Sequence, residues 1–365
     1  MKINSLEAKN FRIYDQVDVT FNPNTNIFFG NNAQGKTSII EAIYVLGLTK
    51  SHKTNKDRDM IKTNKEYAKI NALIHLNEKD IQLDIILSKL GKKAKYNQIE
   101  LERLSDYIGL LNVVMFAPED LDLIKGNPQV RRKFLDLEIG QISKEYLYNV
   151  QNYKKILKQR NDLLKNMQQK SQDLMLLDIV TEQLIDYIEK IVLKRKAFIH
   201  QINEIAQQIY KDLSNEAHTF KMEYIPSVDK NYKEEFQKKQ QYDIITGTTN
   251  LGVHRDDIEF YIDDHFIKTH SSQGELRSAV LSTKLALVEF IFKRKGEYPV
   301  LLLDDVFSEL DVQRQNNLVQ YINSKTQTFI TTTDLSEINF STIDNYSTFH
   351  IENGTIKESE QYGEH

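Results

Sequence analysis

The segment with the clearest chemistry is Gly30–Ser38, which reads Gly-Asn-Asn-Ala-Gln-Gly-Lys-Thr-Ser. It fits the spacing G-x-x-x-x-G-K-[ST], in which backbone N–H groups surround polyphosphate oxygens. The apolar run Ile27–Phe29 before it predicts a strand, and the amphipathic pattern after it predicts a helix that begins near Thr37. An ordinary glycine turn into a helix could match the letters, but the order strand, loop, helix favours a phosphate-binding loop.

Each position of this loop has an expected role. Gly30 and Gly35 let the backbone approach the phosphates. Lys36 is expected to bring its charge to the β and γ phosphates, and Thr37 to offer its hydroxyl to Mg²⁺. The helix N-terminus adds a positive end. The other expected nucleotide-binding positions are Asn31, Asn32, Ala33, Gln34 and Ser38.

Two further segments complete the predicted site. In Pro299–Asp311 an apolar strand ends in two carboxylates, as a Walker B segment does. Asp304 is predicted to hold Mg²⁺, and Asp305 to polarise an attacking water, so that the predicted catalytic residues are Lys36, Asp304 and Asp305. A small-polar turn before a later amphipathic helix predicts a second anion-binding helix start at Ser272, Gln273 and Gly274.

The composition bounds the kind of protein. A chain of 365 residues with 40% hydrophobic content predicts a globular protein of one large or two medium domains. The absence of cysteine excludes disulfides and thiolate metal sites. No secretion signal or membrane helix is recognisable, so we expect a cytoplasmic protein that does not engage a membrane. The net charge of −4 provides no global attraction to DNA, so any DNA contact must come from local basic patches.

The chain is expected to fold around an inserted helical segment. Short strand patterns before about Leu90 and after Ile258 predict one α/β domain built from both ends of the chain. We assign residues 1–112 plus 245–365 to this head (lobe I) and 113–244 to a mainly helical insertion (lobe II). Long helical periods predict the insertion's helices, and residues 226–250 are expected to form a polar return connection. The helical periods lack a sustained heptad, which favours a short antiparallel hairpin over an extended coiled coil.

Taken together, these motifs resemble the bacterial RecF family of DNA repair and replication proteins, over nearly the whole chain. The segments that carry the resemblance are Gly30–Ser38, Ser51–Thr54, Phe116–Leu121, Lys125–Pro128 with Arg131 and Arg132, Gly252–Asp257, Ser272–Gly274 and Leu303–Asp311. The resemblance implies an α/β, ABC-type P-loop ATPase head of the SMC-like kind with an inserted helical lobe.

The same resemblance implies a function and partners. It implies ATP as the cofactor, with Mg²⁺, and an ATP-dependent homodimer in which each ATP lies between Lys36 of one chain and Ser272 and Gly274 of the other. It also implies DNA binding at gaps or single-strand/double-strand junctions, slow hydrolysis, and partnership with RecR and RecO in loading RecA. The family usually continues its signature with Gly-Gln-Gln-Arg, whereas Glu275 follows Gly274 here, which places a carboxylate near the expected γ-phosphate.

Basic clusters are the candidate DNA contacts. Charge runs are usually solvated faces, but several together predict contact with the DNA backbone without sequence readout. The positions chosen are Lys92, Lys93, Lys95, Arg131 and Arg132. His52 and Lys53 could approach nucleotide or DNA, whereas His254 and Arg255 fit a functional or a structural role equally well.

Three other classes of protein were weighed. A P-loop GTPase needs D-x-x-G followed by N-K-x-D, which this chain does not carry in that order. An ABC transporter subunit would lack the Phe-Ala-Pro-Glu-Asp-Leu segment at 116–121. An SMC-like chromosome-architecture ATPase head is the main alternative, but it would normally carry a long coiled coil, for which the insertion is too short.

Overall fold

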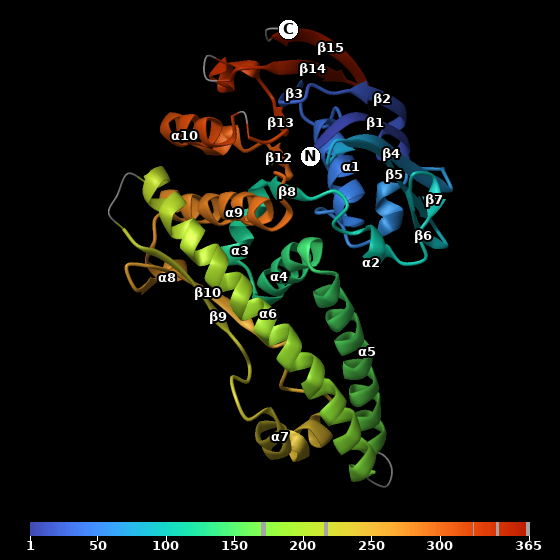
Figure 1. Ribbon diagram of the computed structural model, residues 1–365, viewed down its shortest axis with the longest axis vertical. Helices are drawn as coiled ribbons and strands as arrows, with labels where there is room; N and C mark the ends of the chain where they lie inside the picture. Colours follow the sequence, from blue (N-terminus) through green and yellow to red (C-terminus); the bar gives the residue numbers. More distant parts are fainter. Residues whose placement is uncertain (169–172, 215–217, 324, 341–342, 363–365) are drawn as a thin grey trace. The chain divides into compact units, whose positions relative to one another are not determined.

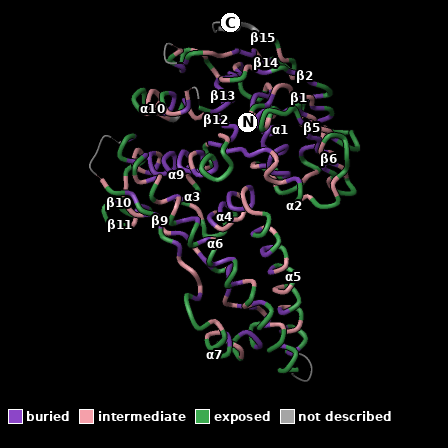
Figure 2. The backbone as a smooth tube through the Cα atoms, in the orientation of Figure 1, coloured by how far each residue is buried: buried purple, intermediate pink, exposed green. Residues whose placement is uncertain are grey.

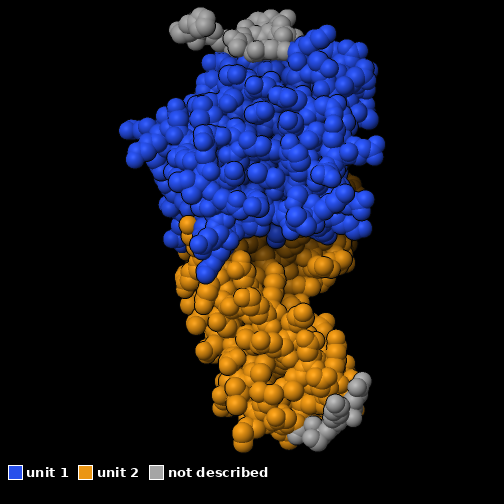
Figure 3. All heavy atoms as spheres, turned by 90° about the vertical axis from the view of Figure 1, so that its right-hand side faces the viewer, with its two compact units in different colours: residues 1–120, 284–365 blue, residues 121–283 orange. Residues whose placement is uncertain are grey.

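The computed structural model describes residues 1–168, 173–214, 218–323, 325–340 and 343–362 (Figure 1). The chain divides into two compact units, residues 1–120 with 284–365 and residues 121–283 (Figure 3). These bounds differ from the predicted ones of 112 and 245. Residues 113–116 pair with a strand of the first unit, and residues 257–262 pair with a strand of the second, so backbone hydrogen bonds assign each segment.

One sheet of the first unit is antiparallel, with the order β2-β1-β4-β5-β6-β7. Its longer strands bury alternate residues, as expected for a sheet with one face on a core. The predicted strands of this region are confirmed, while β6 and β7 were not predicted. The bounds are β1 Lys2–Phe11, β2 Tyr14–Thr20, β4 Tyr67–Leu76, β5 Lys79–Ser88, β6 Gly91–Tyr96 and β7 Ile99–Glu100.

The other sheet of the first unit has the order β15-β14-β3-β13-β12-β8 and is parallel except for β15. Its central strands are buried along their whole length, which explains their unbroken apolar sequences (Figure 2). The bounds are β3 Thr25–Phe29, β8 Val113–Phe116, β12 Val300–Asp304, β13 Thr328–Thr332, β14 Tyr346–Glu352 and β15 Thr355–Tyr362.

Helix α1 (Lys36–Leu48) joins the two sheets of the first unit in one hydrophobic core. Nearly every residue of α1 is buried, and the core cluster includes side chains from β1, β4 and β5 as well as from β12 and β13. A helix that is apolar all round belongs inside a protein. The phosphate-loop candidate therefore precedes a helix that the surrounding sheets hold rigidly. The shorter helices described in this unit are α2 (Leu104–Tyr107) and α10 (Val312–Ile322).

The second unit is mainly helical. Its longest helices, α5 and α6, pack side by side (Figure 1), and side chains of Asn127 and Ser143 cap α4 and α5. A small sheet of order β11-β10-β9 completes it. The bounds are α3 Asp122–Lys125, α4 Pro128–Ile142, α5 Lys144–Met167, α6 Leu174–Ser214, β9 Phe220–Ile225, α7 Tyr232–Thr246, β10 Asp257–Ile262, β11 His265–Phe266 and α8 Ile267–His270, and α9 (Gln273–Lys295) begins here and ends in the first unit.

Helix α7 corrects the prediction of a polar return connection over residues 226–250. Glu234 and Glu235 lie in its first turn, and Gly247 ends it with a φ of 64°. Few apolar residues face inward, among them the buried Phe236 and Ile244. The Lys- and Gln-rich sequence therefore lacks the apolar period on which the prediction depended.

Buried charges tie the elements of the second unit together. The Arg195 side chain is 2% exposed and donates to Asp256 at 3.1 Å, to Asp136 at 2.9 Å and to the Tyr146 hydroxyl at 2.9 Å. Burial acts to raise the pKa of Asp136, but Arg195 and Lys154 together bring that pKa below its ordinary value. These residues lie on α4, α5 and α6 and at the start of β10, so the network fixes their packing.

Candidate nucleotide site

The phosphate-loop candidate joins β3 to α1, as predicted, and both of its glycines are required by sterics. Gly30 has a φ of 139°, and a Cβ there would lie 2.4 Å from the carbonyl oxygen of Ile351. Gly35 has a φ of 115°, and a Cβ there would lie 2.7 Å from the Tyr14 hydroxyl. Any side chain at either position would therefore clash with its neighbour as well as strain the backbone.

Two contacts that the sequence did not reveal hold the loop from outside. The Tyr14 hydroxyl donates to the carbonyl of Gly35 at 3.1 Å. Gln34 accepts twice from the turn between β14 and β15, through its side chain from the Asn353 N–H at 2.5 Å and through its carbonyl from the Gly354 N–H at 3.2 Å. The Asn-Gly pair predicted that turn, but nothing in its sequence indicated a contact with the loop.

The Lys36 side chain is buried, with 7% of its surface exposed. Its ammonium donates to the carbonyl oxygens of Gly30 and, at 2.9 Å, Asn31, and so spans the loop. Asn31, Asn32 and Ala33 are exposed at the loop's outer turn, while Ser38 donates its N–H to the Gly35 carbonyl at 2.9 Å in the first turn of α1.

The structure brings the loop and the predicted Walker B acid together. The Thr37 hydroxyl donates to Asp304 Oδ1 at 2.9 Å. The same oxygen accepts from the hydroxyl of Thr331 at 2.8 Å. Asp304 ends β12 and is aligned with Thr331 on β13 in the parallel register. Thr331 was missed, although threonines in the otherwise apolar run 328–332 were a usable signal.

Two cations approach the second carboxylate oxygen of Asp304. His52 Nε2 lies 4.0 Å and Lys53 Nζ 3.9 Å from Oδ2. The Ser51 hydroxyl positions this segment, because it accepts from the N–H of Lys53 at 2.9 Å while donating to Glu41. Burial raises the pKa of Asp304 above its ordinary value, and the hydrogen bonds from Thr331 and Thr37 and the charge of Lys53 oppose that shift.

Asp305 follows in an unusual backbone conformation. Its φ is 56°, in the left-handed region, and its N–H donates to the Thr331 hydroxyl at 3.0 Å. For a residue other than glycine this region costs about 1–3 kcal/mol, which is typically tolerated where function requires it. The half-buried Asp305 thus leaves the strand direction immediately after Asp304.

The oxygen ligands at Thr37 and Asp304 fit Mg²⁺. A hydroxyl and a carboxylate are hard donors, and Mg²⁺ is usually bound by one or two such groups with phosphates and water. Among the described residues, no group of three or more His, Asp or Glu side chains could bind a metal by itself. A magnesium ion at Thr37 and Asp304 would accordingly depend on the nucleotide for its other ligands.

The predicted signature turn lies at the start of α9, in the second unit. The Ser272 hydroxyl accepts from the Glu275 N–H at 3.2 Å, and the Glu275 carboxylate accepts from the Ser272 N–H at 2.6 Å. This reciprocal pair is a capping box. Gln273 accepts from Lys125 at 3.0 Å, and Gly274 is half-buried beside it. Glu275 therefore stabilises the helix start on which the prediction for Ser272 depends.

The predicted DNA contacts differ in how accessible they are. Arg131 is only 7% exposed and binds Asp257 through two hydrogen bonds of 2.6 and 3.0 Å, so its position contradicts a role at the surface. Arg132 is half-buried and donates to the Asp256 carbonyl at 2.8 Å. On β6, Lys92 pairs with Asp57 at 2.8 Å and the exposed Lys93 pairs with Glu100 at 2.9 Å, while Lys95 is half-buried.

His254 has the structural role that was one of its two alternatives. Its ring nitrogens contact the Tyr153 hydroxyl and, at 3.1 Å, the Thr249 carbonyl, within the second unit. Burial lowers the pKa of His254 below its ordinary value. The neutral ring therefore serves as a buried polar contact between α5 and the segment before β10.

A phosphate loop that enters a buried helix, beside a strand-end acid bonded to the loop's threonine, defines a P-loop ATPase head of the ABC/SMC-like class. The predicted fold class is confirmed, since residues 2–357 match the family described as RecF/RecN/SMC N terminal domain. An Smc head domain derived from Pyrococcus furiosus has the same fold, with a TM-score of 0.57 over 99% of this chain and 96% of that one at 17% identity.

Closer relatives narrow the class. The DNA replication and repair protein RecF of Bacillus cytotoxicus is 45% identical over 98% of each chain, and that of Bacillus mycoides is equally similar. A solved structure of the recombination mediator protein RecF with ATP, in the RecFOR pathway, matches with a TM-score of 0.92 at 29% identity over 98% of each chain. The chain belongs to the RecF family, as its motifs predicted. In the described part of the chain, no helix has the length and hydropathy needed to cross a membrane.

Proposed function

We propose that this protein is an ATP-dependent DNA-binding protein of recombinational repair and replication restart, and a weak, DNA-stimulated ATPase. The observation that carries the proposal is the hydrogen bond from Thr37 to Asp304, which joins the phosphate loop to the acid of the neighbouring strand. In P-loop ATPases these two groups hold the metal that accompanies the nucleotide. The RecF relative solved with ATP supports ATP as the nucleotide.

Each residue of the site has a definite task in this proposal. Lys36 exchanges its bonds to the loop carbonyls for phosphate oxygens, and the loop N–H groups bind the remaining oxygens. Thr37 and Asp304 would hold Mg²⁺, which would neutralise phosphate charge. Asp305 orients the attacking water and accepts its proton, since its turned backbone separates it from the carboxylate of Asp304.

The site is completed by a second copy of the chain. Ser272, Gln273 and Gly274 of one protomer face the γ-phosphate bound at Lys36 of the other, so that ATP, but not ADP, drives dimerisation. The Ser272 hydroxyl accepts from Glu275 within its own helix and has its proton left to donate to a phosphate oxygen. The Glu275 carboxylate at the same helix start opposes the anion and weakens this contact.

The ATP-bound dimer is proposed to bind gapped DNA or single-strand/double-strand junctions without sequence preference, with Lys92, Lys93 and Lys95 as candidate phosphate contacts. Together with RecO and RecR it helps to load RecA, and slow hydrolysis releases it. Membership of the RecF family supports these partners, and the solved RecF relatives are described as part of the RecFOR pathway. The alternative, an SMC-like architectural head, fits less well because α5 has only 24 residues.

Sedimentation velocity with ATP and with ADP tests the proposal. We expect a dimer with ATP and a monomer with ADP for the wild type, and a monomer in both for Ser272→Arg. Gln183→Arg adds the same charge on the exposed side of α6 and should dimerise normally. A wild-type monomer in both nucleotides would rule out the nucleotide-driven dimer.

Adding DNA to the same runs separates dimerisation from DNA recognition. Gapped DNA should sediment with the ATP-bound dimer, and fully duplex DNA of equal length should do so less. Equal binding of both DNAs with ATP and with ADP would contradict an ATP-dependent preference for gaps.

A further inference from the structure

A cavity of about 190 Å³ lies within the second unit, between α5, α6 and α7. At roughly 30 Å³ of liquid volume per water molecule, it has room for about six waters. It is therefore large enough for a ring-sized group but too small for most drug-sized ligands. Arg160 of α5 forms part of its wall.

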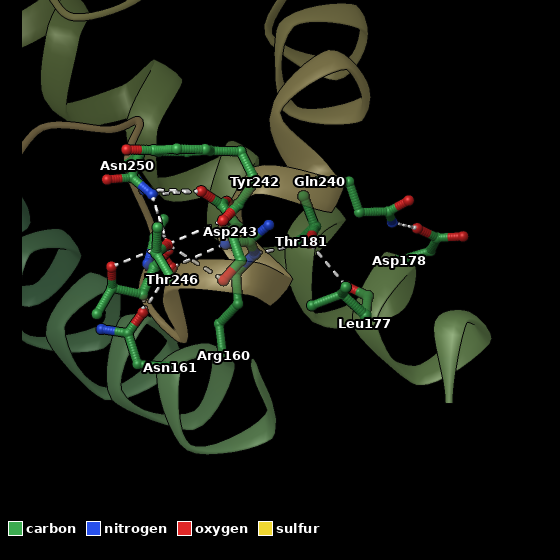
Figure 4. A network of polar contacts seen from close by, with 12 residues as sticks. Arg160, Asn161, Leu177, Asp178, Thr181, Gln240, Tyr242, Asp243, Thr246 and Asn250 are labelled. Carbon is green, nitrogen blue, oxygen red and sulfur yellow. Dashed lines mark hydrogen bonds and ion pairs between the residues drawn. The ribbon is translucent and has the colours of Figure 1, made fainter. Parts of the chain in front are cut away.

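Arg160 is fully buried, yet its hydrogen bonding is incomplete (Figure 4). Nε donates to Thr181 at 2.9 Å, and Nη1 donates to Asp243 and Thr249, each at 2.8 Å. Nη2 has no acceptor in the part of the chain that the structure describes. Buried donors are almost always paired, so the two N–H groups of Nη2 are available to an acceptor oxygen that a ligand brings into this cavity.

The charges around the cavity disfavour an anionic ligand. The charge of Arg160 is balanced by Asp243, which is also fully buried. At the rim, Lys233 pairs with Glu182 at 2.7 Å, and the carboxylate of Asp178 is present in excess. An added negative charge would face two rim carboxylates, so a neutral ligand is favoured.

The same rim favours a ligand that also donates hydrogen bonds. Asp178 accepts from the Gln240 amide at 2.7 Å and has further acceptor capacity, as has the Gln240 side-chain oxygen. The amide of Gln237 adds another donor and acceptor. A fitting ligand therefore presents an acceptor oxygen to Arg160 and N–H groups to the rim.

The apolar part of the lining favours a flat ring. Ile185 and Phe236 line the cavity, and the Arg160 guanidinium lies over the Phe236 ring at 5.3 Å from its centroid. A nucleobase combines a planar apolar face with carbonyl oxygens and N–H groups on one edge. The carboxamide of an Asn or Gln side chain offers the same polar groups but leaves most of the cavity unfilled.

We propose that this cavity binds one nucleobase, with a base carbonyl oxygen accepting from Arg160 Nη2 and base N–H groups donating to Asp178 and Gln240. The base could belong to a free nucleoside or to an unpaired stretch of DNA. Both sources present the same chemistry, and they differ in whether a sugar-phosphate chain continues outside the rim.

Thymidine and deoxycytidine are suitable probes, because they lack the phosphates on which the Gly30–Ser38 loop depends. We would measure their binding to the full chain without ATP by saturation-transfer NMR and calorimetry, beside deoxyribose and acetamide. We expect one or both nucleosides to bind and the sugar not to bind. Failure of both nucleosides to bind would overturn the proposal, and so would tighter binding of acetamide, which would indicate a protein carboxamide instead.

A matched pair of variants locates the binding. Ile185→Phe fills the cavity from α6, and Ile179→Phe makes the same change at a position of α6 that is 49% exposed. We expect Ile185→Phe to weaken nucleoside binding by about tenfold or more and Ile179→Phe to change it by less than about twofold. Arg160→Met is a second test if it folds despite leaving Asp243 unpaired. Wild-type affinity in Ile185→Phe would overturn the proposal.

A short oligothymidylate distinguishes the two sources of the base. If Ile185→Phe weakens binding of the oligonucleotide as much as that of thymidine, the ligand is an unpaired base of single-stranded DNA. If only thymidine binding falls, the ligand is a free nucleoside.

Discussion

Two sets of buried polar groups, one in each unit, show how similar chemistry serves different ends. In the second unit, Arg195 is bonded to carboxylates and hydroxyls on several elements, and the pKa of its partner Asp136 is lowered. In the first unit, burial raises the pKa of Asp304, whose nearest cations are 3.9 and 4.0 Å away. A charge that is fully paired stabilises the fold, whereas one held by hydroxyls is kept ready for a cation from outside.

The largest effect is expected where the paired network is broken. Arg195→Met leaves Asp256 and Asp136 buried without their cation, which should lower the free energy of unfolding by about 3–5 kcal/mol. Urea denaturation measures the loss. The neighbouring change Lys194→Met removes only an exposed pair with Glu145 and should cost less than about 1 kcal/mol. Equal urea midpoints for both variants would contradict the structural role of the network.

The next largest effect concerns binding and leaves the fold intact. Lys36→Met removes the ammonium that spans the loop, so ATP affinity should fall on the order of 100-fold, as for the loss of strong charged hydrogen bonds. ATP-dependent binding of gapped DNA should disappear in fluorescence anisotropy. Lys50→Met, just beyond α1, is the control. Nucleotide-dependent DNA binding that persists in Lys36→Met would mean that this loop is not the site.

A smaller effect is expected behind the loop. Tyr14→Phe deletes the hydroxyl that donates to the Gly35 carbonyl, at a cost of about 1 kcal/mol. Since the loop must keep its shape to bind phosphates, we expect roughly fivefold weaker ATP binding by calorimetry. Tyr67→Phe, at an exposed position of β4, should bind ATP normally. Unchanged affinity in Tyr14→Phe would show that Gln34 and its turn hold the loop without help.

The smallest effect has the opposite sign. A raised pKa in the folded state means that ionised Asp304 lowers stability at neutral pH, and that this loss begins as pH rises above its ordinary value of 3.8. Asp304→Asn should therefore raise Tm by roughly 2–4 °C at pH 7 while abolishing ATP hydrolysis. Thermal scans between pH 7 and pH 4 should show the difference shrinking as wild-type Asp304 becomes protonated. A lower Tm for the variant at pH 7 would contradict this account.

The sequence was most informative where local rules act. The loop, the strand before it, the strand that ends in Asp304 and the turn at Asn353-Gly354 all have spacing or residue types with a direct structural meaning. The long helices α5 and α6 were also predicted nearly to their ends, because their apolar residues recur at the helical period.

The sequence was least informative about contacts between distant segments. Thr331, Tyr14 and Gln34 act through neighbours that only the sheet order brings close, and no single sequence reveals that order. Arg131 was assigned to DNA because a basic run looks the same whether it is solvated or paired with Asp257. Helix α7 was missed because only a few of its residues are apolar.

The position of β3 in its sheet has a consequence for protein synthesis. β3 lies between β13 and β14, and the turn that holds Gln34 follows β14. These partners leave the ribosome about 300 residues after β3, a delay of about 15–60 s at ~5–20 residues per second. Throughout that interval the nascent chain carries its phosphate loop on a strand with neither neighbour in place. A nascent RecF-family chain of this kind therefore acquires its nucleotide site as one of the last events of its own translation.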